Sequence, residues 1–387
     1  MEMPIDRRKI AIATTGFCAF LHLYSPQALL PELAREFSAS PAEMSSVMTA
    51  SAAAIALTAP FTGALADVIG RKRVITAAML AVVIPMGLIA LAPSLESMIV
   101  WRFFQGLLLP PIFAVAIAYV GDEWPTAEVP GVAGVYITGA SIGGFAGRFV
   151  PGVLADLSGW RNGFLTLAVM SLAGAVVVAA LLPRERCFVR SEGLRASVRQ
   201  MLRHLRNPQL LATYAIGFGV LFNFIAVFTY VNFHLAAPPY SFSPTLLGTI
   251  FVTYLAGSAT APLIGWAVVR FGRRPFILGV LGAWACGAVL LLAQPISAII
   301  IGLLLCAVCG MLCQAISTGY VTAIAKEGRS SAVGLYVTAF YVGGSMGALL
   351  PGLAWSAAGW PACVAMALAM LAIMTTIATL AYRRVAA

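Results

Sequence analysis

Long apolar runs separated by short polar loops form the dominant pattern of this 387-residue chain. Each run is long enough for the ~20 residues that cross a lipid bilayer as an α-helix. Twelve runs can be placed, at residues 10–30, 44–66, 74–93, 98–120, 131–155, 162–182, 208–233, 244–269, 275–293, 296–324, 331–355 and 361–381. The pattern therefore predicts an all-α membrane protein with twelve transmembrane helices.

Composition strengthens this prediction, because 61% of the residues are hydrophobic and only 10% are charged. Soluble domains average about 25% charged residues, so membrane lipid is the expected surrounding of most of the chain. The net charge of +10 does not indicate a nucleic-acid partner. The basic residues sit in short loops between apolar runs and not on one face of a domain.

The positions of the basic residues predict the orientation, because cytoplasmic loops carry an excess of Lys and Arg. With the N-terminus placed inside, only Arg35 and Arg161 fall in outside loops, and Arg102 and Arg148 fall within spans. All the other basic residues then lie on the inner side. We expect a multi-pass protein of the cell inner (plasma) membrane with both termini in the cytoplasm.

The second half of the chain repeats residues of the first half. Thr58, Gly63 and Gly70 recur as Thr260, Gly265 and Gly272. A longer set recurs 200 residues later, namely Gly134, Tyr136, Thr138, Gly143, Gly144, Gly147, Pro151, Gly152, Gly159 and Trp160. Two homologous halves in an apolar chain predict a pseudo-symmetric transporter with a central site. We expect a six-helix bundle at 1–182, a cytoplasmic linker with an amphipathic helix at 183–207, and a second six-helix bundle at 208–387.

The loop after the second span carries a family resemblance. It reads G-A-L-A-D-V-I-G-R-K-R from Gly63 to Arg73. This resembles the G-x-L-x-D-x-x-G-R-K/R loop of the major facilitator superfamily, and the resemblance covers essentially the whole chain. The copy after the eighth span is degenerate, with Val269 where the acid would be. The resemblance implies two six-helix domains that rock about a site at the membrane midplane.

The charges of this loop suggest a gate on the inner side. Gly63 would let the second span approach a neighbouring helix, and Gly70 would permit a tight turn. We expect Asp67 to pair with Arg329, and Arg71 to pair with Asp122 or Glu123. Such ion pairs would hold the inside closed in one state and break in the other. The alternative is that these charges only anchor the loop and fix the topology.

The fourth span begins W-R-F-F-Q-G at Trp101. Its Arg102 and Gln105 are similar to an R-x-x-Q-G pattern that the resemblance associates with proton-coupled members. An arginine within a span is costly and needs a partner. The alternative is that Arg102, close to the outer end of the span, reaches the lipid headgroups.

The glycine spacing of the fifth span, which includes Gly143 and Gly147, resembles the antiporter motif of drug/proton exchangers. Gly343 and Gly347 keep the spacing in the repeat. We expect this groove to pack closely at the interface between the domains. Arg148 stands where the motif has proline, and its counterpart in the repeat is Ala348. Arg148 would bind an anionic substrate group or a carboxylate of the transporter; a structural salt bridge is the alternative.

Further candidates lie in three other spans. In the first span, His22, Tyr24 and Gln27 stand in a stretch where drug exporters of this family often show D-x-Y-x-P, with His22 at the position of the acid. Histidine exchanges protons near neutral pH, although a hydrogen-bonded core histidine is an equal alternative. Asn223 lies among aromatic residues of the seventh span, and Tyr336 lies in the repeated glycine span.

These features predict a secondary active transporter, with proton-coupled efflux of small organic, drug-like molecules by alternating access. One alternative is an organic-anion transporter, possibly an importer, with Arg102 and Arg148 as a carboxylate clamp; another is a membrane sensor on the same scaffold. No catalytic constellation is visible, so we do not expect an enzyme. The seven cysteines suit packing better than metal binding or disulfides. We expect small molecules, protons and lipid as partners, no cofactor, and a monomer.

Overall fold

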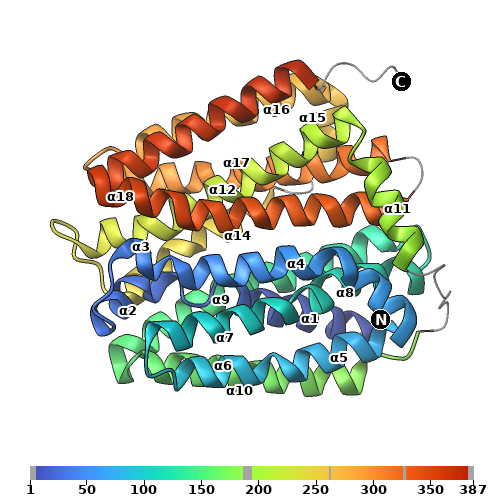
Figure 1. Ribbon diagram of the computed structural model, residues 1–387, viewed down its shortest axis with the longest axis horizontal. Helices are drawn as coiled ribbons and strands as arrows, with labels where there is room; N and C mark the ends of the chain where they lie inside the picture. The colour runs from blue at the N-terminus through green and yellow to red at the C-terminus, as the bar shows by residue number, and fades with distance from the viewer. Residues whose placement is uncertain (1–5, 186–193, 261–262, 326–327, 382–387) are drawn as a thin grey trace, which may run out of the picture.

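The computed structural model describes residues 6–185, 194–260, 263–325 and 328–381. All regular elements in these ranges are helices, and the described residues contain no strand (Figure 1). The structure therefore confirms the all-α prediction.

The described residues before the linker form ten α-helices and one short 3-10 helix. These are α1 (Arg7–Leu23), η1 (Gln27–Leu29), α2 (Leu30–Glu36), α3 (Pro41–Met44), α4 (Ser46–Ile69), α5 (Arg71–Ala81), α6 (Val83–Ala90), α7 (Leu95–Leu108), α8 (Pro110–Glu123), α9 (Val129–Ser158) and α10 (Trp160–Leu181). We call these elements the N-terminal helices.

The rest of the chain forms α11 in the linker and the elements that we call the C-terminal helices. They are α11 (Leu194–His204), α12 (Pro208–Ala236), α13 (Pro244–Thr249), η2 (Ile250–Val252), α14 (Thr253–Ala259), α15 (Leu263–Phe271), α16 (Arg273–Leu290), α17 (Ile296–Ile324) and α18 (Arg329–Ala381). Figure 1 shows the N-terminal helices in one layer, the C-terminal helices in the other, and α11 at one end of both.

Within the described ranges, nine helices are long and apolar enough to cross a membrane. The predicted first and eighth spans differ because their helices are interrupted. Helix α1 has 17 residues before the chain turns into η1, and residues 244–260 and 263–271 form several short helices. The predicted last two spans are joined in α18, which has non-helical backbone at Ala358 and Gly359. Twelve spans remain a prediction.

Glycines with positive φ make the sharp turns between helices. Gly70 (φ 102°) joins α4 to α5, and its repeat partner Gly272 (φ 80°) joins α15 to α16. Gly159 (φ 91°) and Gly359 (φ 67°) form the second such pair. Side chains with a Cβ atom rarely adopt this backbone conformation, so glycine is required there. The tight turn predicted at Gly70 is therefore confirmed.

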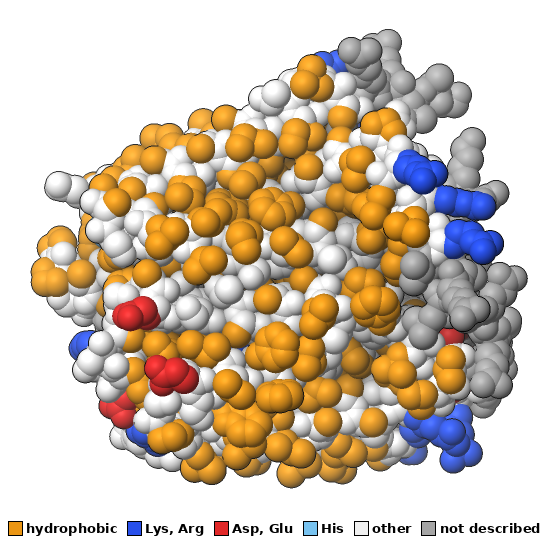
Figure 2. Space-filling model, in the orientation of Figure 1, with side chains coloured by type: hydrophobic (Ala, Val, Ile, Leu, Met, Phe, Trp, Pro, Cys, Tyr) orange, Lys and Arg blue, Asp and Glu red, His pale blue; other side chains and the backbone are white. Residues whose placement is uncertain are grey.

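The outer surface of the helices is strongly apolar. Figure 2 shows hydrophobic side chains spread over the flank of the molecule, with Lys and Arg gathered mainly at the end where α11 and the N-terminus lie. Large side chains such as Leu57, Ile84 and Val169 are more than half exposed. Lipid is the solvent in which such a surface is stable.

The glycines of the fifth span pack inside one set of helices. A Cβ on Gly143 or Gly147 of α9 would overlap the carbonyl oxygen of Phe17 or Leu21 of α1. Both α1 and α9 are N-terminal helices, so the expectation that this groove packs between the two domains was wrong. The groove is filled by α1, because small residues let two helix backbones approach closely.

Candidate functional site

A cavity of about 480 Å³ lies between the two sets of helices. Its wall comes from α1 and α9 on one side and from α12, α14, α17 and α18 on the other. Aromatic residues, among them Phe20, Tyr24, Tyr136, Tyr254 and Phe340, dominate the wall. A volume of this size and an apolar, aromatic lining with a few polar groups are typical of sites for small organic molecules.

Contacts between the N-terminal and the C-terminal helices close one end of the molecule. A Cβ on Gly152 of α9 would collide with the backbone of Pro244 at the start of α13. A Cβ on Gly352 of α18 would press on Ala42 of α3. The backbone N–H of Thr245 also donates to Asp156 Oδ2 at 2.9 Å. The two sets of helices therefore touch backbone to backbone at this end.

The cavity is not enclosed on every side, because part of its lining is exposed. Ile137 of α9 lines the cavity and is 45% exposed. On α17, the lining residues Gln314 and Gly319 are also exposed. A Cβ on Gly319 would meet no atom within 4 Å. Access to the cavity is therefore from the side of Ile137 and Gly319.

Arg148 of α9 lies in the cavity wall and is completely buried. Its Nε donates to Gln27 Oε1 at 2.9 Å, and its Nη1 donates to the Gly144 carbonyl at 2.6 Å. Its Nη2 has no hydrogen-bond partner among the described residues. Gln27 in turn donates to Thr229 of α12 at 3.2 Å, so the N-terminal and C-terminal helices share this arrangement.

Three aromatic rings surround the guanidinium of Arg148. Its carbon Cζ lies 4.4 Å from the ring centre of Tyr24, 4.4 Å from that of Phe251 and 4.5 Å from that of Tyr254. Cations are attracted to ring faces at such distances. None of the salt bridges formed by described side chains involves Arg148, so the alternative of a structural salt bridge is not realised in that part of the chain.

The other arginine within a span, Arg102 of α7, has a different environment. It is completely buried, so it does not reach the headgroups. Its guanidinium donates to the carbonyls of His22, Leu23 and Val47, to Ser51 Oγ and to Gln105 Oε1. An arginine has five N–H donors, and here each has an acceptor. Arg102 does not line the cavity and forms no clamp with Arg148.

His22 belongs to the same network as Arg102. Because Arg102 can only donate, it fixes the amide of Gln105 with Oε1 toward the guanidinium. Gln105 Nε2 then faces His22 Nδ1 at 2.9 Å, so Nδ1 accepts. The proton of the neutral imidazole is on Nε2, which lies 2.6 Å from Ser171 Oγ of α10. His22 is buried and lies outside the cavity lining.

Comparison with known proteins identifies the family. The family model described as Major Facilitator Superfamily matches residues 12–238 and 221–387. The chain belongs to the major facilitator superfamily. It is 31% identical to the inner membrane transport protein YnfM of Escherichia coli (strain K12), over 98% of this chain and 91% of that protein. It is 30% identical to the uncharacterized MFS-type transporter YybF of Bacillus subtilis (strain 168), over 94% and 91%.

Solved structures of superfamily members share the fold at low sequence identity. The nucleoside transporter NupG superposes with a TM-score of 0.80 at 14% identity, covering 97% of this chain and 100% of that one. A bacterial homolog of the human lysosomal transporter Spinster, in an inward-facing and occupied conformation, superposes with a TM-score of 0.77 at 14% identity, covering 97% and 96%. The family match and the relatives named as transporters make the chain a multi-pass membrane transporter, and the solved structures agree with this in fold.

In the superfamily loop, the structure brings Arg71 and Asp122 together. Arg71 Nη1 lies 2.6 Å from Asp122 Oδ2, and Arg71 Nη2 lies 3.7 Å from Asp67 Oδ1. The side chain of Arg329 lies outside the described part of the chain, so its pairing with Asp67 stays a prediction. Gly63 does not mark a close helix contact as expected, because a Cβ there would meet nothing within 4 Å.

Asn223 and Tyr336 are not among the residues that line the cavity. Asn223 Nδ2 donates to the Gly219 carbonyl at 3.0 Å, within its own helix. Tyr336 packs under Gly217 of α12 and stacks on the lining residue Phe340. Of the residues predicted to act on substrate or protons, only Tyr24 and Arg148 line the cavity, and Gln27 supports Arg148.

The sequence-based prediction did not include several residues of the cavity lining, among them Tyr254, Gln314 and Thr318. None carries a charge or belongs to a recognised motif, and residues 244–269 read as one apolar run. The sequence signal that could have indicated this region is the presence of Gly257 and Pro262 within the run, because hydrophobic segments with Gly and Pro form broken helices at the binding sites of many transporters. Tyr254 lies on α14, one of the short helices of this region.

Proposed function

We propose that this protein is a secondary active transporter that moves small organic molecules by alternating access. The supporting observation is the cavity that the N-terminal and C-terminal helices share, closed at one end by Gly152–Pro244 and Gly352–Ala42 and open at the side of Gly319. Breaking the closed contacts and forming new ones at the open side would expose the cavity to the other side of the membrane.

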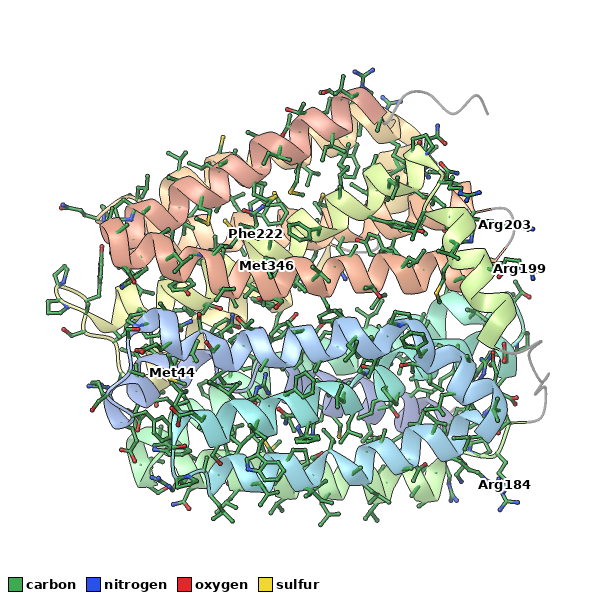
Figure 3. All side chains as sticks on the ribbon, viewed as in Figure 1. Met44, Arg184, Arg199, Arg203, Phe222 and Met346 are labelled. Atoms are coloured by element: carbon green, nitrogen blue, oxygen red, sulfur yellow. The ribbon has the colours of Figure 1, made fainter. Side chains whose placement is uncertain are left out.

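We further propose that the open side of the cavity faces the cytoplasm. Figure 3 places Arg184, Arg199 and Arg203 at the end where α11 lies, as the positive-inside rule requires of a cytoplasmic end. His204 of α11 hydrogen-bonds the carbonyl of Gly328 at the start of α18. In this topology the elements α1–α2 form one span, the elements α13–α15 form another, and α18 forms two. The twelve spans make two bundles, at 1–182 and 208–387, and both termini are cytoplasmic.

In our proposal the transporter exports its cargo in exchange for protons, and His22 carries the proton. The neutral His22 described above is held by Gln105 and Ser171. Protonation of Nδ1 requires Gln105 to turn away, which also removes an acceptor from Arg102. A proton on His22 would thus be linked to a rearrangement of α1 against α7, whose side chains form this network.

Transport by purified protein in proteoliposomes tests this function. A broad panel of labelled organic compounds is offered with and without an imposed pH gradient, while a trapped dye reports the internal pH. We expect at least one compound to accumulate only with the gradient and to dissipate it. The His22→Ala variant should lose the proton movement, and Asn223→Ala, which changes a buried polar residue of α12, should keep it.

Two results would contradict the proposal in different ways. Compound flux that is unaffected by the gradient and by His22→Ala would remove proton coupling and leave transport. Saturable binding without any flux would indicate a membrane sensor, which is one of the alternatives that the sequence leaves open. Names of relatives do not decide the cargo, because similar folds carry different substrates.

A further inference from the structure

The cavity of this protein contains an unbalanced positive charge. Its lining includes the buried Arg148 and, among the described residues, no aspartate or glutamate side chain. No described carboxylate forms a salt bridge with Arg148. Removing a charge from water is costly unless a partner of opposite charge replaces the hydration. The cavity therefore contains a cation for which the described part of the protein supplies no partner of opposite charge.

The contacts of Arg148 orient its free side. Nε is fixed by Gln27, and Nη1 is fixed by the carbonyl of Gly144 in the same helix. The remaining nitrogen, Nη2, is buried and has no acceptor among the described residues. A guanidinium that is held at two of its nitrogens and unpartnered at the third has N–H groups left to donate to a ligand oxygen.

The surroundings of Arg148 indicate the rest of the ligand. Rings of Tyr24 and Tyr254 flank the guanidinium and also line the cavity. Phe20 and Phe340 extend the aromatic lining. Aromatic walls favour flat apolar molecules that stack on them. A cationic ligand would meet Arg148, and the described residues of the lining offer no acidic side chain to balance the charge of that ligand.

We propose that the cargo is an organic anion with a flat apolar body, and that Arg148 Nη2 binds its carboxylate or other anionic group. This inference rests on the proposed transport function and specifies its substrate class. Of the two arginines within spans, Arg148 binds the anion, because all five N–H donors of Arg102 already have acceptors. The competing explanation is that Arg148 only holds Gln27 and the three rings in place.

Binding to the purified, intact protein tests the proposal with probes that share a ring and differ in charge. One set is 2-naphthoate, 2-naphthamide and 2-naphthylmethylamine; the second is benzoate, benzamide and benzylamine; the third is indole-3-acetate, indole-3-acetamide and tryptamine. Calorimetric titration at pH 7 compares the affinities. We expect at least one carboxylate to bind about tenfold or more tightly than its amide, as a hydrogen bond to a charged group allows, and the amines to bind weakest.

Two arginine variants locate the site. Arg148→Gln should abolish the preference for the carboxylate over the amide, and Arg148→Lys should retain part of it because the charge remains without the planar group. Arg161→Gln is the matched control. It removes the same charge from an exposed arginine paired with Glu36 and should leave the preference unchanged. If Arg148→Gln does not fold, the affinities for carboxylate and amide in the unmodified protein and in Arg148→Lys still test the proposal.

The proposal is overturned if no carboxylate binds better than its amide, or if the preference persists in Arg148→Gln. Counterflow in proteoliposomes separates this failure from that of the transport function. Amides or amines that are transported while carboxylates are excluded would leave transport standing and remove the anion site. A carboxylate that binds through Arg148 and does not move would leave the anion site standing and remove transport.

Discussion

The helix pair α1 and α9 and the helix pair α12 and α18 have the same packing and different chemistry. Gly143 and Gly147 lie against the backbone of Phe17 and Leu21, and Gly343 and Gly347 lie in the same way against Phe218 and Phe222. Figure 3 shows Phe222 and Met346 on this second pair of helices. The repeat thus preserves the close approach of the two backbones.

The polar groups differ between the two pairs. Where α9 has the buried Arg148, α18 has the buried Ala348. The residue after Leu21 is His22, and the residue after Phe222 is Asn223; His22 contacts Ser171 of α10, whereas Asn223 contacts Met374 of α18. The glycines, which are the same in both helix pairs, therefore specify the packing. The ionisable residues Arg148 and His22 occur in only one of the two pairs.

The largest expected effect comes from breaking the shared packing. Gly143→Leu and Gly343→Leu should each prevent stable folding, with a loss of more than about 3 kcal/mol, because the new side chain meets backbone atoms that no rotamer change can move. Thermal unfolding followed by size-exclusion chromatography measures the effect. Gly134→Leu is the control, since a Cβ there meets nothing within 4 Å. Equal stability of all three variants would show that the glycine contacts do not specify the scaffold.

The second prediction compares the two buried arginines. Arg102→Met leaves several buried acceptors without a donor and should cost about 3–5 kcal/mol, as for a broken buried charge network. Arg148→Met removes a cation without a charged partner in the described structure and loses mainly its ring contacts. We expect its cost to be at least about 2 kcal/mol smaller. Denaturation of both variants in one detergent checks the difference, and similar losses would contradict it.

Much of the fold could be predicted from the sequence, because helix length, apolar pattern and turn glycines act locally. The all-α architecture and the turn at Gly70 follow from such signals. The interruptions of the first and eighth spans did not, since the apolar pattern continues through them. The site was predicted less well: Arg102 and Arg148 looked alike as charges within spans, and only the three-dimensional positions of acceptors distinguish them.

The third prediction concerns His22 and Asn223. His22→Leu removes a partner from Gln105 and from Ser171 and should cost about 2–3 kcal/mol, because two buried polar groups lose a hydrogen bond. Asn223 already has an oxygen without a partner among the described residues, so Asn223→Leu should change stability by less than about 1 kcal/mol. Chemical unfolding compares them. A larger loss for Asn223→Leu would mean that the second helix pair depends on its polar residue after all.

The smallest expected effect concerns the contacts between the N-terminal and the C-terminal helices at the closed end. Asp156 accepts from the Thr245 N–H across the seam, whereas Ser356, its repeat partner, hydrogen-bonds the Gly352 carbonyl of its own helix. The start of α3 is capped locally by Ser40 and Glu43. At Asp156, a hydrogen bond to a charged group therefore joins the N-terminal and the C-terminal helices. At the repeat position, the hydrogen bond of Ser356 stays within its own helix.

Asp156→Ala should favour opening of this end by about 1.5 kcal/mol, the lower range for a hydrogen bond to a charged group, which is about a tenfold change in population. Spin labels at Leu157→Cys and Leu246→Cys in a cysteine-free background report the distance across the seam, because both positions are exposed. We expect a longer distance to gain population in Asp156→Ala and not in Ser356→Ala. If both variants change the distribution equally, the two seams hold the closed end in the same way, and the asymmetry between the helix pairs does not extend to this gate.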